Sequence, residues 1–506
     1  MSNLNLKQYF RASMLLLMLA VLVGSLLVSL YPTGQYEGTS YLGVPVLETV
    51  DEREIKTYQY RDYSEHLTFR GEYVPVDQRH GTIYLSQNMD SLTGNGDING
   101  KLSVDLPGRM LYFAPDEAWE NIPEAIQNGH RFRLLITDRS GTYMQYDVIF
   151  TRLPVISMYG ELLYKDTEGR NVLSGQLRVW DPDGSVLSSR VQWHVRGKTS
   201  SGEDKKPWKL SLKNKEGKNR SENILGLGAD DDWILNAMNM EDTDVREMLF
   251  MDLWNEVAAD TAYNSSMSTG RYAELLINGE YHGLYLLQRR IDSNYLELSA
   301  KDVLVKGIRE AEVTGYEQVS SYAGDERQRQ LLEAFFTDSD YRMLSVPNFI
   351  DVNLFMQMFC ARDNSTNKNM YYLFSGAENG YRISLIPWDT DMAFGIEWDP
   401  VSGGFIYRYD NNLQRNVLRQ EMGLMQQLYP DLHQQMSIRW KELRETVFSQ
   451  EYIYEKIGKY CRLLDESGAP ARDYEKWGFY YEGEDTVENL YRFIDGRLQY
   501  LDGYYQ

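Results

Sequence analysis

ARDNSTNKNMYYLFSGAENGYRISLIPWDTDMAFG, residues 361–395, indicates more about the fold and chemistry of this chain than any other stretch. Its apolar and aromatic run from Met370 to Phe374 predicts a strand, and a second predicted strand leads into Pro387-Trp388. Around these strands lie side chains that suit metal binding or proton transfer: Asp363, Asn369, Asp389 and Asp391. An Asp, a downstream Asn and an Asp just after a second strand favour phosphoryl transfer.

The chemistry of phosphoryl transfer explains why these residue types matter. Divalent cations neutralise the charge that develops on phosphoryl oxygens, and Mg²⁺ prefers a few carboxylate or amide oxygens while keeping several waters. Asn369, Asp389 and Asp391 can supply such oxygens. The attacking hydroxyl needs a carboxylate that accepts its proton, and Asp363 is the candidate for that role.

The same segments resemble a known family. Asp363 with Asn369-Met370-Tyr371-Tyr372-Leu373-Phe374, and Pro387-Trp388-Asp389-Thr390-Asp391 with Phe394-Gly395, closely resemble the signature segments of the CotH-type kinases, the spore coat protein H family of atypical protein kinases. Upstream segments extend the resemblance, in the family's order, over roughly Leu153 to Tyr500: Arg196 to Ser201, Lys205 to Leu210, Asp232 to Asn236, and Leu276 to Tyr285.

The resemblance implies a role for each matching position. Asp363 would be the catalytic-loop Asp, Asn369 the catalytic-loop amide, Asp389 the metal-binding Asp and Asp391 a second carboxylate of that site. Lys206 would contact the nucleotide phosphates, with Arg196, Lys198 and Ser200 nearby. The implied cofactors are ATP and Mg²⁺, with Mn²⁺ as an alternative. Lys198 and Lys209 remain rivals of Lys206, because strand alternation puts Lys206 and Trp208 on one face and Lys209 on the other.

Two departures from the family pattern bear on activity. The loop between Asp363 and Asn369 is one residue longer than the usual kinase spacing, so Asn367 or Lys368 competes with Asn369 for the amide position. After Leu284-Tyr285-Leu286-Leu287 the family commonly carries a Glu two residues on, whereas this chain continues with Gln288-Arg289-Arg290. A catalytically inactive member is therefore an alternative.

Composition restricts the partners. The chain has 506 residues, a net charge of −22 and a sequence pI of about 4.8. Such an acidic chain argues against nucleic acid as a partner, because phosphate contacts would work against its global field. Its six histidines and two cysteines include no Cys or His pair at metal spacing, so we expect no zinc site and no disulfide framework.

The N-terminus carries a predicted membrane anchor. The run from Ala12 to Leu30 is apolar apart from small residues, and at about 1.5 Å per residue it nearly matches a hydrocarbon core of roughly 30 Å. Lys7 and Arg11 precede the run and acidic residues follow it, which places the bulk of the chain outside the cytoplasm. A cleaved signal peptide is the rival, but no small-x-small site follows the run. We therefore expect a single-pass cell-membrane protein.

Periodicity predicts an α+β protein with several parts. Residues 1–31 form a cytoplasmic stub and anchor, and 32–57 a tether. Alternating segments in 58–152, beginning with His66 to Val74, predict a small all-β accessory domain of Ig-like sandwich type. The remainder, 153–506, is predicted as a two-lobed, protein-kinase-like domain, with a sheet-rich lobe at 153–310 and a helical lobe at 311–506.

Several elements of this large domain are predictable individually. Arg271 to Ile277 and Gly283 to Gln288 predict a hairpin joined by Asn278-Gly279. Asp242-Thr243-Asp244 predicts the cap of a helix from Val245 to Val257. Apolar residues at three- and four-residue spacing predict further helices: Arg327 to Phe336, Val346 to Cys360, Met422 to Tyr429, Leu432 to Ser449, Gln450 to Leu464 and Val487 to Tyr500.

Three functions from different classes follow from these residues. The first is an extracytoplasmic kinase that phosphorylates Ser or Thr of surface or spore-coat-type proteins. The second is an inactive member that acts in adhesion or assembly at the cell surface. The third is a carboxylate-pair hydrolase of glycans that uses Asp389 and Asp391, or Asp363, with tryptophans as sugar platforms. It ranks last because Asp389 and Asp391, at i and i+2 of a strand, would share one face and suit a shared metal better than opposed acid and base roles.

Overall fold

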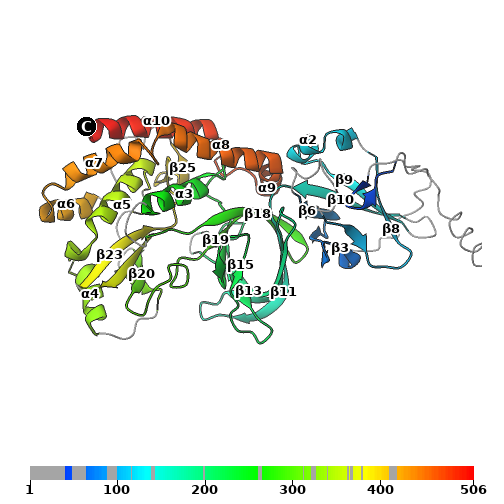
Figure 1. Ribbon diagram of the computed structural model, residues 1–506, viewed down its shortest axis with the longest axis horizontal. Helices are drawn as coiled ribbons and strands as arrows, with labels where there is room; N and C mark the ends of the chain where they lie inside the picture. The colour runs from blue at the N-terminus through cyan, green and yellow to red at the C-terminus, as the bar shows by residue number, and fades with distance from the viewer. Residues whose placement is uncertain are drawn as a thin grey trace, which may run out of the picture. The chain divides into compact units, whose positions relative to one another are not determined.

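The computed structural model describes residues 40–47, 64–87, 100–115, 117–137, 143–197, 200–259, 265–310, 313–320, 326–338, 340–361, 364, 369–377, 380–408, 419–481 and 483–506. The chain falls into two compact units, Met1–Phe150 (unit 1) and Thr151–Gln506 (unit 2). Helices and sheets of both units confirm the predicted α+β class (Figure 1). The Ig-like and kinase-like assignments of the parts stay predictions.

Unit 1 is built around two sheets and a short helix. One sheet has the strand order β5-β6-β10-β9-β8 and the other the order β4-β3-β7. Phe113, Trp119, Phe132 and Phe150 pack their rings together at centroid distances from 4.5 to 6.4 Å. The elements are β1 Ser40–Tyr41, β2 Val44–Pro45, β3 Leu67–Phe69, β4 Glu72–Tyr73, β5 Val76–Asp77, β6 Thr82–Ser86, β7 Leu102–Val104, β8 Met110–Phe113, α2 Ile122–Gln127, β9 Phe132–Thr137 and β10 Tyr143–Thr151.

The alternating segment from His66 to Val74 forms two short strands, β3 and β4. The chain turns at Arg70-Gly71, where both residues have positive φ (54° and 83°), and β3 pairs with β4 as a two-stranded hairpin. Gly at the second position accepts this conformation at no steric cost. The alternation of apolar residues continued through the turn, and this continuity hid the reversal of the chain.

Unit 2 begins with a closed barrel of seven strands in the order β11-β12-β13-β14-β17-β19-β18. Parallel pairing of β11 with β18 closes it, and large side chains such as Trp193, Trp233 and Tyr285 fill it. The strands are β11 Val155–Lys165, β12 Asn171–Trp180, β13 Val186–Val195, β14 Trp208–Lys213, β17 Asp232–Asn236, β18 Gly270–Ile277 and β19 Glu280–Arg289; the short pair β15 Glu222–Asn223 and β16 Ala229–Asp230 lies outside the barrel order.

The predicted hairpin at Asn278-Gly279 is confirmed. Ile277 pairs with Glu280, and the two turn residues have φ values of 49° and 74°. Positive φ at both central residues is the conformation that an Asn-Gly pair favours in a two-residue turn. The pairing of β18 with β19 in the barrel could therefore be predicted from the turn sequence alone.

Between β17 and β18 the chain forms helix α3 (Arg246–Ala259), and its predicted cap is wrong. The carboxylate of Glu241 accepts the backbone N–H groups of Arg246 (2.6 Å) and Glu247 (3.3 Å). Asp242, which was predicted as part of the cap, instead accepts the N–H groups of Tyr480 and Tyr481. The longer Glu side chain reaches the helix from further upstream, outside the spacing on which the prediction relied.

After the barrel follow a second sheet and most of the helices. Its strand order is β21-β20-β22-β23, and helix α5 packs against β23, α7 and α10 (Figure 1). The helix predicted to end at Ser449 ends at Arg444, and α9 was not predicted. The elements are β20 Val303–Glu310, β21 Val313–Gln318, α4 Glu326–Phe336, α5 Val346–Phe359, β22 Met370–Ala377, β23 Gly380–Pro387, β24 Ile396–Asp399, β25 Gly404–Tyr407, α6 Arg419–Leu428, α7 Leu432–Arg444, α8 Gln450–Ser467, α9 Ala469–Trp477 and α10 Val487–Tyr504.

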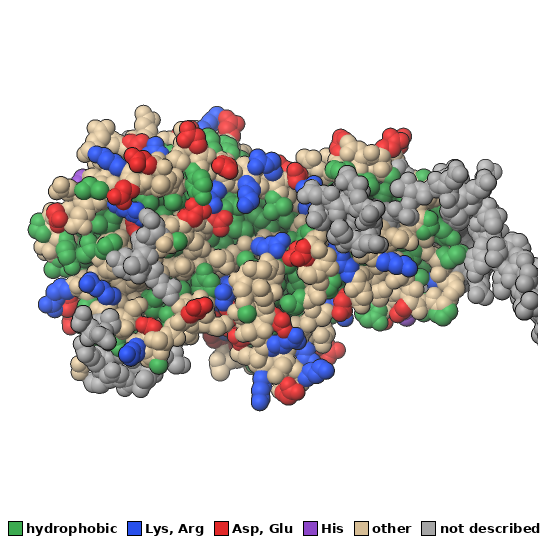
Figure 2. Space-filling model, in the orientation of Figure 1, with side chains coloured by type: hydrophobic (Ala, Val, Ile, Leu, Met, Phe, Trp, Pro, Cys, Tyr) green, Lys and Arg blue, Asp and Glu red, His purple; other side chains and the backbone are tan. Residues whose placement is uncertain are grey.

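Three further predictions concern the membrane anchor, the two cysteines and the surface charge. In the described ranges no helix has the length and apolarity that a membrane crossing requires, and the predicted anchor at 12–30 lies outside those ranges. Cys360 and Cys461 are both free thiols. In the view of Figure 2, basic and acidic side chains of unit 2 are interspersed, so the net negative charge is not concentrated on that face.

One buried ion pair links the start of α3 to the start of α10. Both guanidinium Nη atoms of Arg246 donate to the carboxylate of Asp485, and the two side chains are 1% and 0% exposed. Asp485 also accepts the backbone N–H of Asp242 at 2.8 Å. Removing one partner of such a pair leaves a buried charge without compensation.

We therefore expect Asp485→Ala to lower the free energy of unfolding by about 3–5 kcal/mol, measured by urea denaturation. The control is Glu488→Ala, which removes the exposed Arg492–Glu488 pair one turn along the same helix and should cost less than about 1 kcal/mol. Equal effects of the two substitutions would contradict the account of the buried pair.

The cap of α3 also predicts a pH dependence. Burial raises the pKa of Glu241 to about 7, against the opposing effect of Arg246 and of its two N–H donors. The unfolded chain therefore releases this proton at lower pH than the folded chain, and stability from this group is complete below about pH 4.5 and lost as pH rises to about 7.

We expect the free energy of unfolding of the wild type to fall between pH 5 and pH 7 relative to that of Glu241→Gln, by about 2 kcal/mol. The Gln variant keeps an acceptor oxygen but cannot ionise. Urea denaturation at both pH values measures the difference, and parallel pH profiles of the two proteins would show that Glu241 does not titrate as described.

Candidate functional site

The ends of β22 and β23 place two of the predicted site residues side by side. Met370 pairs with Pro387, so Asn369 lies just before one strand and Trp388-Asp389 just after its neighbour. The carbonyl oxygen of Asn369 accepts the N–H of Trp388 at 3.0 Å and the Nδ2 of Asn364 at 2.9 Å. Asn364 also donates to the carbonyl of Trp388 at 2.7 Å. The buried amide of Asn364 thus fastens the two strand ends together.

Asp389 is exposed and lies in a loop, because β23 ends at Pro387. Its φ of 58° is left-handed, a conformation that costs most non-Gly residues energy but that Asp and Asn adopt more readily than others. The premise that Asp389 and Asp391 occupy one face of a strand is therefore wrong. A backbone held in this region at a charged residue is typical of functional sites.

Asp391 lies in different surroundings from Asp389. Burial raises the pKa of Tyr480, and the carboxylates of Glu203 and Asp391 add to that rise. Burial also raises the pKa of Tyr481, and Asp391 adds to that rise. The charge of Asp389, by contrast, contributes to the pKa shifts of Glu247, Lys306 and Tyr371, in each case toward a higher pKa. The two carboxylates thus act electrostatically on different groups: Asp391 on Tyr480 and Tyr481, and Asp389 on Glu247, Lys306 and Tyr371.

A buried carboxylate, Glu247 of α3, supports the Asp389 loop. Glu247 accepts the hydroxyl of Thr390 at 2.9 Å and the Nε2 of Gln288 at 3.1 Å. Burial raises the pKa of Glu247, the neighbouring Asp389 adds to the rise, and the two hydrogen bonds together with Arg196 oppose it. Gln288, which marked a departure from the family pattern, is thus the hydrogen-bond donor to a carboxylate that the neighbouring helix supplies.

Two cations and two aromatic rings form a row beside Asp389. The guanidinium carbon of Arg196 lies 5.5 Å from the ring centroid of Trp388, whose ring is 6.1 Å from that of Tyr371. The Nζ of Lys306 lies 5.9 Å from the Tyr371 centroid. Burial lowers the pKa of Lys306, an effect that Asp389 opposes and Arg196 reinforces. We call Arg196, Trp388, Tyr371 and Lys306 the cation–aromatic row.

The predicted phosphate lysine, Lys206, and its rival Lys209 are already engaged by other groups of the chain. Lys206 precedes β14 and donates its ammonium to the carbonyls of Ser201 (3.0 Å) and Glu203, so it holds its own loop. Lys209 pairs with Asp232 at 2.9 Å. The alternation predicted for this strand is present, because Trp208 is buried and Lys209 is half-buried on the other face.

The remaining predicted residues divide into described and undescribed ones. Ser200 lies in the turn after Gly197, whose φ of 84° is a left-handed conformation that favours glycine. Lys198 and Asp363, with the competing Asn367 and Lys368, lie outside the described residues. Their assignments stay predictions.

Sequence reasoning missed Glu247 and Lys306. Glu247 had a weak signal, because it directly precedes the wholly apolar run from Met248 to Met251 of a helix that the sequence predicts. Lys306 had none: it comes from β20, far from every motif, and reaches the site only through the pairing of β20 with β22, in which Lys306 lies opposite Tyr371.

The donor set around Asp389 fits a weakly held Mg²⁺ better than a metal with an all-protein cage. Within the described residues no three His, Cys, Asp or Glu side chains gather as a metal site. Asn369 and Asp389 offer one amide and one carboxylate at adjoining strand ends. Mg²⁺ accepts such a small donor set because it keeps several waters and takes further oxygens from substrate phosphates.

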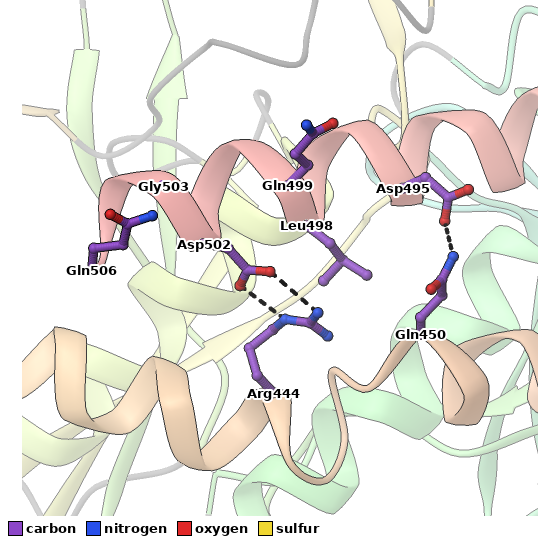
Figure 3. A pocket seen from close by; sticks show the side chains of 8 residues that line it. All are labelled: Arg444, Gln450, Asp495, Leu498, Gln499, Asp502, Gly503 and Gln506. Carbon is purple, nitrogen blue, oxygen red and sulfur yellow. Dashed lines mark hydrogen bonds and ion pairs between the residues drawn. The ribbon is translucent and has the colours of Figure 1, made fainter.

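A separate pocket lies where α10 passes the connection between α7 and α8 (Figure 3). Its three charged side chains are already bonded: Arg444 pairs with Asp502 at 2.9 Å, and Asp495 accepts the amide of Gln450 at 2.6 Å. The pocket shares no residue with the cluster around Asp389, and its chemistry points to no ligand.

The bond between Thr390 and Glu247 yields a test of the local architecture. Thr390→Val keeps the shape but removes one donor to a buried carboxylate, so we expect a loss of about 1–3 kcal/mol in the free energy of unfolding, measured by urea denaturation. Thr446→Val, an exposed site with the same chemical change, should cost less than about 0.5 kcal/mol. A neutral Thr390→Val would mean that Glu247 does not depend on this donor.

Comparison with known proteins agrees with the resemblance seen in the motifs. The family model described as CotH kinase protein matches residues 193–501, more than half of the chain, and spans Arg196, Glu247, Lys306, Asn369 and Asp389. None of the curated proteins compared with the chain is detectably similar to it in sequence. Because this family model matches more than half of the chain, this chain belongs to the CotH kinase family.

Proposed function

We propose that this chain is an ATP- and Mg²⁺-dependent kinase that phosphorylates Ser or Thr hydroxyls of proteins at the cell surface or in a spore-type coat. Membership of the CotH kinase family supports a kinase-like phosphotransferase at the general level. The observation that carries the finer proposal is the meeting of Asn369 and Asp389 at adjoining strand ends, fastened by Asn364.

Each residue of the site has a task in this proposal. Asn369 and Asp389 would hold Mg²⁺, or Mn²⁺ in its place, with Asp391 as a further carboxylate. A bound divalent cation supplies charge neutralisation at the phosphoryl oxygens. Asp363 orients the acceptor hydroxyl and takes its proton.

The cations and the support of the loop complete the proposed site. Arg196 and the turn that contains Ser200 lie toward the phosphates, and Lys206 orders that turn by bonding the carbonyls of Ser201 and Glu203. Glu247 holds Thr390 and with it the backbone of the Asp389 loop. Positioned charges of this kind are the main source of catalysis in phosphoryl transfer, because the protein has little covalent chemistry to perform.

One of the reasons for considering a catalytically inactive adhesion or assembly protein is weakened by the structure. That reason was Gln288, which stands where the family commonly carries a Glu. Gln288 is fully buried and donates to Glu247, so a buried carboxylate is present next to Arg196 and Asp389 from another element. We therefore prefer the kinase to an adhesion or assembly role, which becomes an outcome of the test below. The glycan hydrolase ranks last, because the family match supports a kinase-like phosphotransferase and gives no support to a hydrolase.

The proposal also includes a place in the cell. The apolar run at 12–30, with basic residues before it and acidic residues after it, supports a single membrane anchor with units 1 and 2 outside the cytoplasm. A protein substrate at the cell surface or in a coat, and the membrane itself, are then the expected partners.

Two substitutions separate metal binding from transfer. Asp389→Asn removes the carboxylate but tolerates the left-handed backbone, so we expect it to abolish the rise in melting temperature that ATP with Mg²⁺ or Mn²⁺ gives the full-length chain in detergent. Asp363→Ala should keep that rise and lose phosphoryl transfer, measured as incorporation of labelled phosphate into protein.

Asp338→Asn, an exposed Asp distant in sequence from the motifs, is the control and should behave as wild type. Equal loss of nucleotide binding in the Asp363 and Asp389 variants would refute the assignment of roles. No melting-temperature response of the wild type to any nucleotide with either metal would favour the adhesion or assembly function.

A further inference from the structure

Unit 2 neutralises most of its interior cations with a carboxylate partner. In and around the barrel, cations pair with carboxylates at short distance: Lys205 with Asp473 (2.8 Å), Lys209 with Asp232 (2.9 Å), Arg289 with Asp230 (2.8 Å), Arg290 with Asp232 (3.0 Å) and Arg472 with Glu274 (2.6 Å). A half-buried cation without such a partner is costly, because a charge removed from water needs compensation.

Arg196 and Lys306 are exceptions to this rule. Among the described residues, the contacts of the Arg196 guanidinium and the Lys306 ammonium are the rings of Trp388 and Tyr371, and neither cation has a carboxylate at ion-pairing distance. Both are half-buried. Each therefore keeps donor capacity for a group that the chain itself does not supply.

Strand register directs Lys306 toward the site. Lys306 lies opposite Tyr371 on β22, and Tyr371 lies opposite Ile386 on β23. Cross-strand partners point to the same face of a sheet, so Lys306, Tyr371 and Ile386 share a face. This face leads to Trp388-Asp389, where β23 ends. On the other side of Lys306, its partner on β21 is the exposed Glu317.

The aromatic rings fix the two cations without neutralising them. A cation over a ring face is stabilised by about 0.5–2 kcal/mol. The ring carries no net charge, so the cation keeps its full positive charge. Trp388 and Tyr371 are 4% and 6% exposed, so the rings are held by packing. The row therefore presents two fixed positive charges at the edge of an otherwise acidic chain, beside the predicted metal-binding Asp389.

We propose that Arg196 and Lys306 bind the phosphate chain of the nucleotide, and that Lys306, rather than Lys206, is the phosphate-contacting lysine of this chain. The inference rests on the proposed function, because it assumes a phosphate-bearing ligand at Asp389. A polyphosphate fits this site chemically: its oxygens accept charge-assisted hydrogen bonds from ammonium and guanidinium groups and share the metal with the carboxylate.

Isothermal titration of the full-length chain in detergent tests this inference. The probes are MgATP and magnesium tripolyphosphate, which share the phosphate chain, and adenosine, which lacks it. We expect Lys306→Met to weaken both phosphate-bearing probes at least about tenfold, because one charge-assisted hydrogen bond is lost. Lys306→Arg should restore part of the affinity. Lys206→Met, in which the loop loses its internal fastening but the phosphates keep their contact, should have the smaller effect.

The matched control is Lys215→Met, which makes the same chemical change in an exposed turn of unit 2 and should bind both probes as wild type does. Wild-type affinity of the Lys306→Met protein, or a larger loss in Lys206→Met, would overturn the inference. If Lys306→Met does not fold, labelling of the wild type with an amine-reactive ester replaces it: tripolyphosphate with Mg²⁺ must protect Lys306 and not Lys215, and no protection of Lys306 would overturn the inference.

The outcomes also separate this inference from the proposed function. Tripolyphosphate binding that depends on Lys306, without any phosphoryl transfer, would uphold the phosphate site and contradict the kinase. Phosphoryl transfer with an unchanged KM for ATP in Lys306→Met would uphold the kinase and contradict the phosphate site.

Discussion

The pairing of β22 with β23, and the closure of its end by Asn364, is the constraint on which the site depends. A single buried amide donates to the carbonyls of Asn369 and Trp388, while the N–H of Trp388 donates to Asn369. A buried donor that is satisfied in this way favours one arrangement, because any other arrangement leaves it without a partner. The meeting of Asn369 with Asp389 follows from these bonds.

Three other elements bring the remaining charged side chains of the candidate site to this junction. Helix α3 brings Glu247, which holds Thr390; β20 brings Lys306; and the end of β13 brings Arg196. The buried pair of Arg246 with Asp485 fixes the start of α3 to the start of α10, so the position of Glu247 depends on packing at the C-terminal helices. The chemistry at an exposed loop thus rests on fully buried charges elsewhere in unit 2.

The local signals of the sequence predicted those parts of the fold that short stretches determine. The Asn278-Gly279 hairpin and helices α3 and α5 were predictable, because turn chemistry and apolar spacing act within a few residues. The Arg70-Gly71 reversal was missed because alternation continued through it. Helix α9 was missed because its contacts are long-range: Arg472 and Asp473 bond Glu274 and Lys205, about two hundred residues or more away in sequence.

The residues of the candidate site also fall into those that local sequence motifs indicate and those that only long-range strand pairing brings to the site. Asn369 and Asp389 became candidates from motif order, since each lies beside a strand that the sequence predicts, and they stay predictions as metal ligands. Lys306 could not be found, because its place beside Tyr371 depends on a pairing between strands more than sixty residues apart. The choice of Lys206 was plausible from its motif, yet its ammonium bonds its own loop. Which lysine keeps a free charge is decided by partners that only the folded chain brings together.

The most direct test of the central claim is a crystal structure of the full-length chain with Mn²⁺ and a non-hydrolysable ATP analogue, with Mn²⁺ located by its anomalous scattering. The account predicts the metal at coordination distance from Asp389 and the side-chain oxygen of Asn369, with the phosphates between it and the cation–aromatic row. A metal and nucleotide bound away from the ends of β22 and β23 would contradict it.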